Sequence, residues 1–226
     1  WERRAARLRK RLRLGDRPLL VGVDRVDYTK GIPERLRAVD RLLARHPELA
    51  GTFHLVQVGA PSRTHLPAYQ ELNEQVRELA DDINWRHGTP GWQPVVVLNE
   101  HLGPADVFLL YRMAAGCVVS ALHDGMNLVA KEFVTARPDG QGVLVLSRFT
   151  GAARELADAV LVNPFDADEL ADGLHAALTM PECEQQRRMR RMRELVADHN
   201  IYRWAGMLLS EVGRLVGPAD VAVLSP

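Results

Sequence analysis

Short apolar runs alternate with amphipathic segments along most of the chain, and this alternation predicts the secondary structure. The runs are rich in Val and Leu and mostly lack the apolar–polar alternation of a half-buried strand. Such runs are typical of parallel strands that are buried on both faces. Six strands are therefore expected, at residues 19–23, 52–59, 94–99, 116–121, 142–147 and 159–164.

Segments with helical periodicity lie between these strands and follow the last one. The expected helices cover residues 33–46, 67–80, 104–114, 127–137, 150–157, 166–179, 182–198 and 201–215. Repeated strand–helix units predict an α/β fold: a doubly wound, mostly parallel, six-stranded Rossmann-like sheet with helices on both faces and a helical C-terminal segment. One domain is expected over residues 1–216, followed by a tail at 217–226.

The composition narrows the classes of partner. The 226 residues include 29 basic and 29 acidic side chains, so no net charge argues for a nucleic acid partner. We see no signal peptide and no apolar stretch near the ~20 residues that span a membrane, so no membrane partner and a cytoplasmic location are expected. The chain begins at Trp1 rather than Met, which suggests a piece of a longer protein.

The loop after the first strand carries two cations. Ligands of doubly wound sheets bind outside the carboxyl ends of the strands, where helix N-termini direct their N–H groups. Arg25 and Lys30 lie in such a loop, just before a helix, and their charges suit a diphosphate. The alternative is that Arg25 pairs with Asp24 or Asp27 at the surface, which is worth only ~0–1 kcal/mol.

Two further loops fall at strand ends. Arg63 follows the second strand and would project toward the same edge of the sheet, which alone is a weak signal. The stretch ALHDGMNLVAKEF follows the fourth strand, and its Gly125 would let the backbone approach a ligand closely. Asp124 could accept hydrogen bonds from a sugar, and Glu132 from vicinal hydroxyls. Alternatively, Asp124 or Asn127 only caps the helix, for ~1 kcal/mol.

Other common chemistries find no support. The eight histidines are scattered, and neither H-E-x-x-H nor C-x-x-C occurs, so no metal site is expected. The two cysteines, Cys117 and Cys183, are too few for a disulfide framework, and Cys117 is expected to be a small buried apolar residue.

Four segments, in this order and spacing, resemble a known family. They are VDRVDYTKGIPERL, APSRTHLPAYQEL, GWQPVVVLNEHL and ALHDGMNLVAKEFV. Together they are similar to glycosyltransferase family 20, the trehalose-6-phosphate synthases, over about residues 15–215. The resemblance implies the second, donor-binding domain of a GT-B enzyme, in which two Rossmann-like domains face each other across a cleft.

The resemblance also implies roles for individual residues. Arg25 and Lys30 would hold the donor diphosphate and Asp124 the transferred glucose, and these three would be the catalytic residues. The remaining donor contacts would come from Leu102, Gly125, Met126, Asn127, Leu128 and Glu132. Leu102 would lie at the base and Glu132 at the ribose, whereas Arg63 would bind the acceptor phosphate. Lys131 is expected to face solvent, and His123 departs from the arginine that is common in the family at this place.

The implied reaction transfers glucose, with retention, from UDP-glucose or GDP-glucose to glucose 6-phosphate, without a cofactor or metal. The family's N-terminal half would be a partner of this chain, so the isolated chain is expected to turn over little; the full-length enzyme could form a homo-oligomer. Two alternatives stay open: a related synthase with another phosphorylated acceptor, such as glycerol 3-phosphate or a cyclitol phosphate, and a non-catalytic sugar-nucleotide-binding regulatory domain.

Overall fold

Six short runs of Val- and Leu-rich sequence form one parallel sheet in the computed structural model, which describes residues 1–60 and 65–215. The strands are β1 (Leu19–Arg25), β2 (His54–Ala60), β3 (Val95–Leu98), β4 (Gly116–Val119), β5 (Val143–Ser147) and β6 (Val160–Val162). Every described strand pair is parallel, and the order is β3-β2-β1-β4-β5-β6. The predicted doubly wound α/β fold is thereby confirmed.

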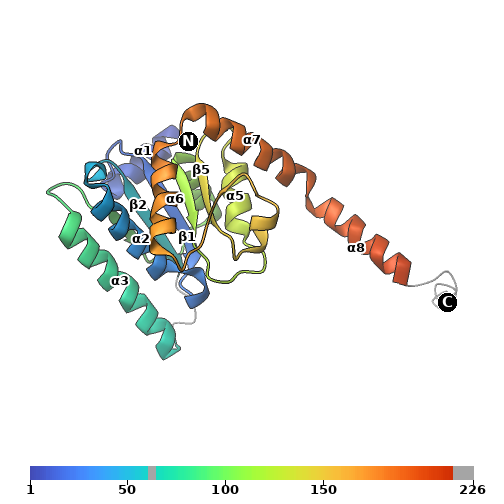
Figure 1. Ribbon diagram of the computed structural model, residues 1–226, viewed down its shortest axis with the longest axis horizontal. Helices are drawn as coiled ribbons and strands as arrows, with labels where there is room; N and C mark the ends of the chain where they lie inside the picture. The colour runs from blue at the N-terminus through green and yellow to red at the C-terminus, as the bar shows by residue number, and fades with distance from the viewer. Residues whose placement is uncertain (61–64, 216–226) are drawn as a thin grey trace.

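Helices cover both faces of this sheet (Figure 1). One core cluster packs the sheet against α1 (Glu2–Arg11), α4 (Pro104–Met113), α5 (Leu128–Ala136) and α7 (Glu182–Asp198). The other cluster packs the opposite face against α2 (Ile32–Arg45), α3 (Pro67–His87) and α6 (Ala167–Thr179). Because both faces are covered, the strands can be apolar on both sides, which explains their continuous apolar runs.

Three short 3₁₀ helices complete the described body: η1 (Tyr28–Lys30), η2 (Pro47–Leu49) and η3 (Gly151–Arg154). The last of them corrects the α-helix that the sequence predicted over residues 150–157. Its four residues form a single tight turn whose backbone bonds to the loop after β4, so the segment folds back instead of continuing as a helix. In contrast, α3 runs to His87, beyond the predicted end at residue 80.

The last described helix, α8 (Ile201–Leu215), extends away from the sheet (Figure 1). None of its described side chains is buried, although the helix carries Trp204 and several large aliphatic residues. The predicted tail at 217–226 lies outside the described residues, as does residue 216, where we placed the end of the domain. No helix in the described ranges is both long and apolar enough to cross a bilayer.

Candidate functional site

The candidate site lies where the strand order reverses. The chain passes from β1 outward to β2 and β3, and then returns to place β4 on the other side of β1. The loops after β1 and β4 therefore diverge from neighbouring strands, which is the position of the ligand crevice in open α/β sheets. The backbone joins these two loops, since Leu122 N–H donates to the Thr29 carbonyl at 2.8 Å.

Gly31 makes this close approach of the loops possible. Its φ of 60° lies in the left-handed region, and a Cβ at this position would lie 2.1 Å from the Ser120 carbonyl oxygen. The Ser120 hydroxyl also donates to the Gly31 carbonyl at 2.8 Å. A residue with a side chain would thus both strain the turn and push the two loops apart.

Lys30 and Asp124 meet across the two loops. Lys30 Nζ donates to Asp124 Oδ2 at 2.6 Å, and the side chains are only 17% and 16% exposed. Burial alone would raise the pKa of the Asp124 carboxyl, but hydrogen bonds from Lys30 and the Met126 N–H, together with the Lys30 charge, hold that pKa below its usual value. The cation predicted for a diphosphate and the acid predicted for a sugar are therefore in direct contact.

Arg25 is the last residue of β1, in the same strand-end loop region as Lys30, and its side chain is exposed. The two acids that could have paired with it are engaged elsewhere: Asp24 pairs with Arg35, and Asp27 accepts from the Thr29 N–H and hydroxyl. Within residues 1–60 and 65–215, Arg25 forms no ion pair. The surface-pair alternative considered from the sequence is therefore wrong for this conformation, and the Arg25 charge is available to an anion.

The loop after β4 leads into the N-terminus of α5. Asn127 caps this helix, because its side-chain oxygen accepts from the Ala130 N–H at 3.0 Å. Asp124 does not cap α5 and instead accepts from the Met126 N–H and the Asn127 amide. Asn127 has a φ of 75°, which few residues other than glycine adopt. The first N–H groups of a helix have no acceptor within the helix, and this is the property that an anion site at a helix start uses.

The residues at the N-terminus of α5 expose apolar side chains and leave free space around the backbone. Met126 and Leu128 are each 57% exposed, and nothing lies within 4 Å of the position that a Cβ on Gly125 would occupy. Glu132 lies further along α5, where its carboxylate accepts from the Tyr111 hydroxyl at 3.3 Å. Leu102 follows β3 and packs partly buried against the same core cluster as α4 and α5. A ligand-contact role for these residues stays a prediction.

A fully buried arginine, Arg35, connects α2 to β1, β2 and the loop after β4. Arg35 of α2 donates to the Gln57 side chain at 2.6 Å and to the Ser120 hydroxyl at 3.1 Å. Its Nη1 also lies 2.8 Å from Asp24 Oδ2, although no N–H is well aimed at that oxygen. Burial raises the pKa of Asp24, and the Arg35 charge opposes that rise. Gly22 leaves the necessary room, because a Cβ there would lie 2.0 Å from Arg35 Nη1.

The buried Arg35 was not predicted from the sequence, although one residue pattern could have indicated it. A glycine inside an apolar strand often marks the close approach of another group, and Gly22 interrupts the run LLVGV. Arg35 gave no comparable signal, because an arginine in an amphipathic helix is normally placed on the solvent side.

The loop after β5 holds the 124–126 segment in place. Gly151 N–H donates to the Asp124 carbonyl at 2.9 Å, and Ala152 N–H donates to the Met126 carbonyl at 2.8 Å. Lys131 also reaches this region, where its Nζ lies 2.9 Å from both carboxylate oxygens of Glu155. The prediction that Lys131 faces solvent is therefore wrong: its ammonium joins α5 to the segment after η3.

Two other sequence predictions concern the rim of the crevice. Arg63, the predicted acceptor-phosphate ligand, lies outside the described residues. His123 is exposed in the loop after β4, and its backbone N–H lies 3.4 Å from the Thr29 carbonyl. Nothing in the structure explains why histidine stands at this position.

Comparison with known proteins identifies the family of this chain. The family model of glycosyltransferase family 20 matches residues 1–214. The chain belongs to glycosyltransferase family 20. A trehalose-6-phosphate synthase from Enterobacter sp. (strain 638) is 41% identical over 196 residues, which cover 86% of this chain and 41% of that protein.

Solved structures of similar proteins share the fold. An alpha,alpha-trehalose-phosphate synthase (UDP-forming) from Burkholderia xenovorans, in complex with glucose-6-phosphate, is 38% identical with a TM-score of 0.87, covering 92% of this chain and 46% of that one. An E. coli structure described as trehalose-6-phosphate bound with UDP-2-fluoro glucose gives the same identity, TM-score and coverage. The chain thus spans less than half the length of these family members.

Proposed function

We propose that this chain is the donor-binding domain of a retaining trehalose-6-phosphate synthase, which transfers glucose from UDP-glucose to glucose 6-phosphate. The observation that carries the proposal is the contact between Lys30 and Asp124 at the point where the strand order reverses, together with an exposed Arg25 at the end of β1. Family members of this type are named UDP-forming, and solved relatives hold glucose-6-phosphate or a fluorinated UDP-glucose.

The proposed mechanism follows from the charges around the crevice. When the glycosidic bond of the donor breaks, negative charge grows on the departing diphosphate. Arg25, Lys30 and the N–H groups at the start of α5 would stabilise that charge in place, so no metal is needed for this step. Asp124 would hold the glucose hydroxyls, and Glu132 the ribose. Loss of one such contact in the full enzyme should cost about 2.7–4 kcal/mol of barrier, by analogy with an oxyanion-hole donor.

The acceptor side of the reaction is assigned to the remainder of the full-length protein and to Arg63. We therefore expect the chain by itself to bind nucleotide weakly and to form little trehalose 6-phosphate. Rapid product formation by these 226 residues alone would contradict this division of labour.

Calorimetric titration with UDP, GDP and ADP tests the proposal directly. UDP should bind most tightly to the parent chain, and Arg25→Ala should weaken that binding at least tenfold, because a bidentate charge contact to the diphosphate is lost. Arg214→Ala is a matched control, since it removes an exposed arginine from α8. Equal affinity of Arg25→Ala and the parent would overturn the diphosphate assignment.

A further inference from the structure

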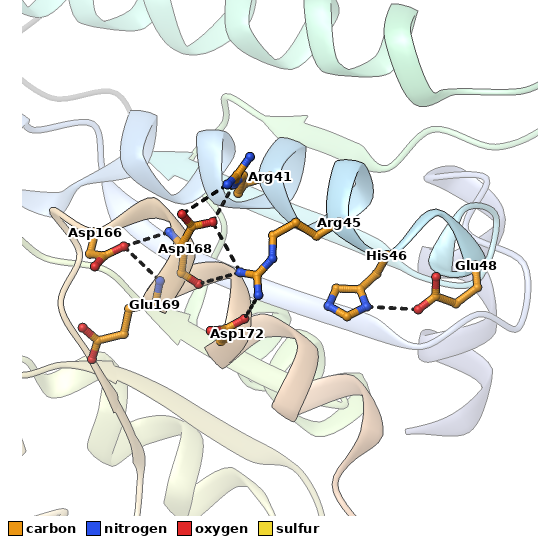
Figure 2. A network of polar contacts seen from close by, with 8 residues as sticks. All are labelled: Arg41, Arg45, His46, Glu48, Asp166, Asp168, Glu169 and Asp172. Atoms are coloured by element: carbon orange, nitrogen blue, oxygen red, sulfur yellow. Dashed lines mark hydrogen bonds and ion pairs between the residues drawn. The ribbon is translucent and has the colours of Figure 1, made fainter.

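The interface between α2 and α6 carries a row of polar side chains that the donor site does not use. Arg41 and Arg45 on α2 pair with Asp168 near the start of α6, and Arg45 also pairs with Asp172, at 2.8 Å (Figure 2). These two arginines are therefore turned toward carboxylates. The residue after Arg45 is His46, so at this end of the interface the polar side chains are imidazoles instead of arginines.

Two histidines and a glutamate converge at this end of the interface. His46 ends α2 in a non-helical conformation and precedes η2, which brings the Glu48 carboxylate to 3.0 Å from His46 Nδ1 (Figure 2). His175 comes from α6, and its ring stacks on that of His46 with centroids 4.2 Å apart. One ligand atom from each of His46, Glu48 and His175 lies within 4.8 Å of the others.

We propose that His46, Glu48 and His175 bind a divalent transition-metal ion with the ligand preference of Zn²⁺. Imidazole nitrogens and a carboxylate oxygen are ligands that Zn²⁺ takes at about 2.0–2.2 Å, so two of them in a tetrahedral site lie about 3.3 Å apart. The atoms here are within about 1.5 Å of that spacing, which rotation of the half-exposed rings and of the exposed Glu48 can supply. Water would take the fourth position.

The charges around this cluster favour binding of a cation, although Arg45 lies next to His46 in the sequence. Arg45, the adjacent cation, is neutralised by Asp168 and Asp172. Glu48 supplies a negative charge, and its carboxylate lies 3.0 Å from His46 Nδ1. The absence of a local histidine motif led us to expect no metal site, but His46 and His175 come from separate helices and their spacing along the chain carries no signal.

The proposed ion would join the end of α2 to the second half of α6. The 14 residues of α2 separate this cluster from the Gly31 turn by roughly 20 Å, so the ion would take no part in the donor site. Because its ligands come together only in the folded chain, binding would stabilise the native state in proportion to ln(1 + [Zn²⁺]/Kd).

The test is calorimetric titration of the chain with ZnCl₂ near neutral pH, carried out in a Cys183→Ser background because the Cys183 thiol is exposed. One Zn²⁺ per chain should bind, with a higher thermal unfolding midpoint, whereas MgCl₂ should do neither because Mg²⁺ prefers oxygen ligands. His175→Asn should lower the Zn²⁺ affinity at least tenfold. Glu48→Gln, at an exposed position, should also weaken binding without risk to the fold.

The matched control is His101→Asn, which removes an exposed histidine from another part of the chain and should leave Zn²⁺ binding unchanged. The ¹⁵N resonances of the His46 and His175 rings should shift together on addition of Zn²⁺. Absence of binding, equal affinity of His175→Asn and the parent, or loss of binding in His101→Asn would each overturn the proposal.

Discussion

At the scale of single residues, the Lys30–Asp124 pair is the centre of the candidate site. Each side chain is the strongest polar partner of the other in the described structure, so the crevice carries little net charge at this point. A donor that brought a diphosphate to Lys30 and a sugar to Asp124 would replace this pair with two new contacts. The pair therefore holds both groups in position before any ligand arrives.

Removing Lys30 should change the titration of Asp124. In Lys30→Met, burial of the Asp124 carboxyl remains while its strongest hydrogen bond and the nearby charge are lost, so the Asp124 pKa should rise. Because the parent's folded pKa is below the unfolded value of about 3.9, the pair stabilises the fold above that pH, and this contribution is lost as pH falls through the folded pKa. Carboxylate ¹³C NMR titration measures the change. Lys10→Met is the control, and an unchanged Asp124 titration in Lys30→Met would contradict the pairing.

Arg35 should matter most for stability. Arg35→Met leaves Asp24 buried without a countercharge, which typically costs about 3–5 kcal/mol of the free energy of unfolding. Arg37→Met on the same helix removes only an exposed pair with Glu34 and should cost less than about 1 kcal/mol. Urea denaturation of both variants checks the difference. Similar losses in the two variants would mean that the buried pair is not what holds the crevice.

At the scale of elements, α5 shows how a helix start can be specified by an unusual backbone. Asn127 combines a side-chain cap with a φ of 75°, so its replacement tests both properties. Asn127→Ala loses the cap, worth about 1 kcal/mol, and adds the strain of alanine at positive φ, of order 1–3 kcal/mol. Asn127→Gly loses the cap but accepts this φ, so it should be the more stable variant. This order is the reverse of ordinary helix propensity, and urea denaturation will show whether it holds.

The secondary-structure elements also differ in how well the sequence predicts them. Apolar runs and helical periodicity were enough for all six strands and for most helices, because those patterns report burial directly. The loops at the ends of β1 and β4 were also predictable, since parallel strands place such loops on one edge. The four-residue η3 was not, because only its hydrogen bonds to the Asp124 and Met126 carbonyls decide its shape.

Contacts between distant elements were the least predictable. The Lys131–Glu155 pair, the packing of Arg35 against Gln57 and Ser120, and the stack of His46 on His175 all join segments that no local pattern relates. In each case the side chain is polar and the sequence favours solvent exposure. Only the fold shows that a partner of matching chemistry lies opposite.

At the scale of the whole molecule, α8 stands apart from the body. Tyr202 and Leu215 are each 84% exposed and Leu209 is 71% exposed, so the apolar side chains of this helix face solvent in the described structure. Such a surface favours self-association in water. The described domain core ends with α7, whose Met189 and Met192 are buried.

A chain that stops after His199 should therefore keep its fold. Because no described side chain of α8 is buried, the thermal midpoint should stay within a few degrees of that of the full chain. The shortened chain should also sediment as a monomer at concentrations where the full chain associates. Differential scanning calorimetry and analytical ultracentrifugation provide the two measurements. A large fall in the midpoint would show that α8 packs on the domain in solution.

The Lys30–Asp124 pair also has a consequence for the time course of folding. It joins residues that are 94 positions apart in sequence, and it can form only after β4 has docked beside β1. Long-range parallel pairing closes large loops and is intrinsically slow, so this contact belongs to the final stages of refolding. Substitutions at the pair should accelerate unfolding more than they slow folding. The capacity to bind a nucleotide would then appear only once β1 and β4 have paired.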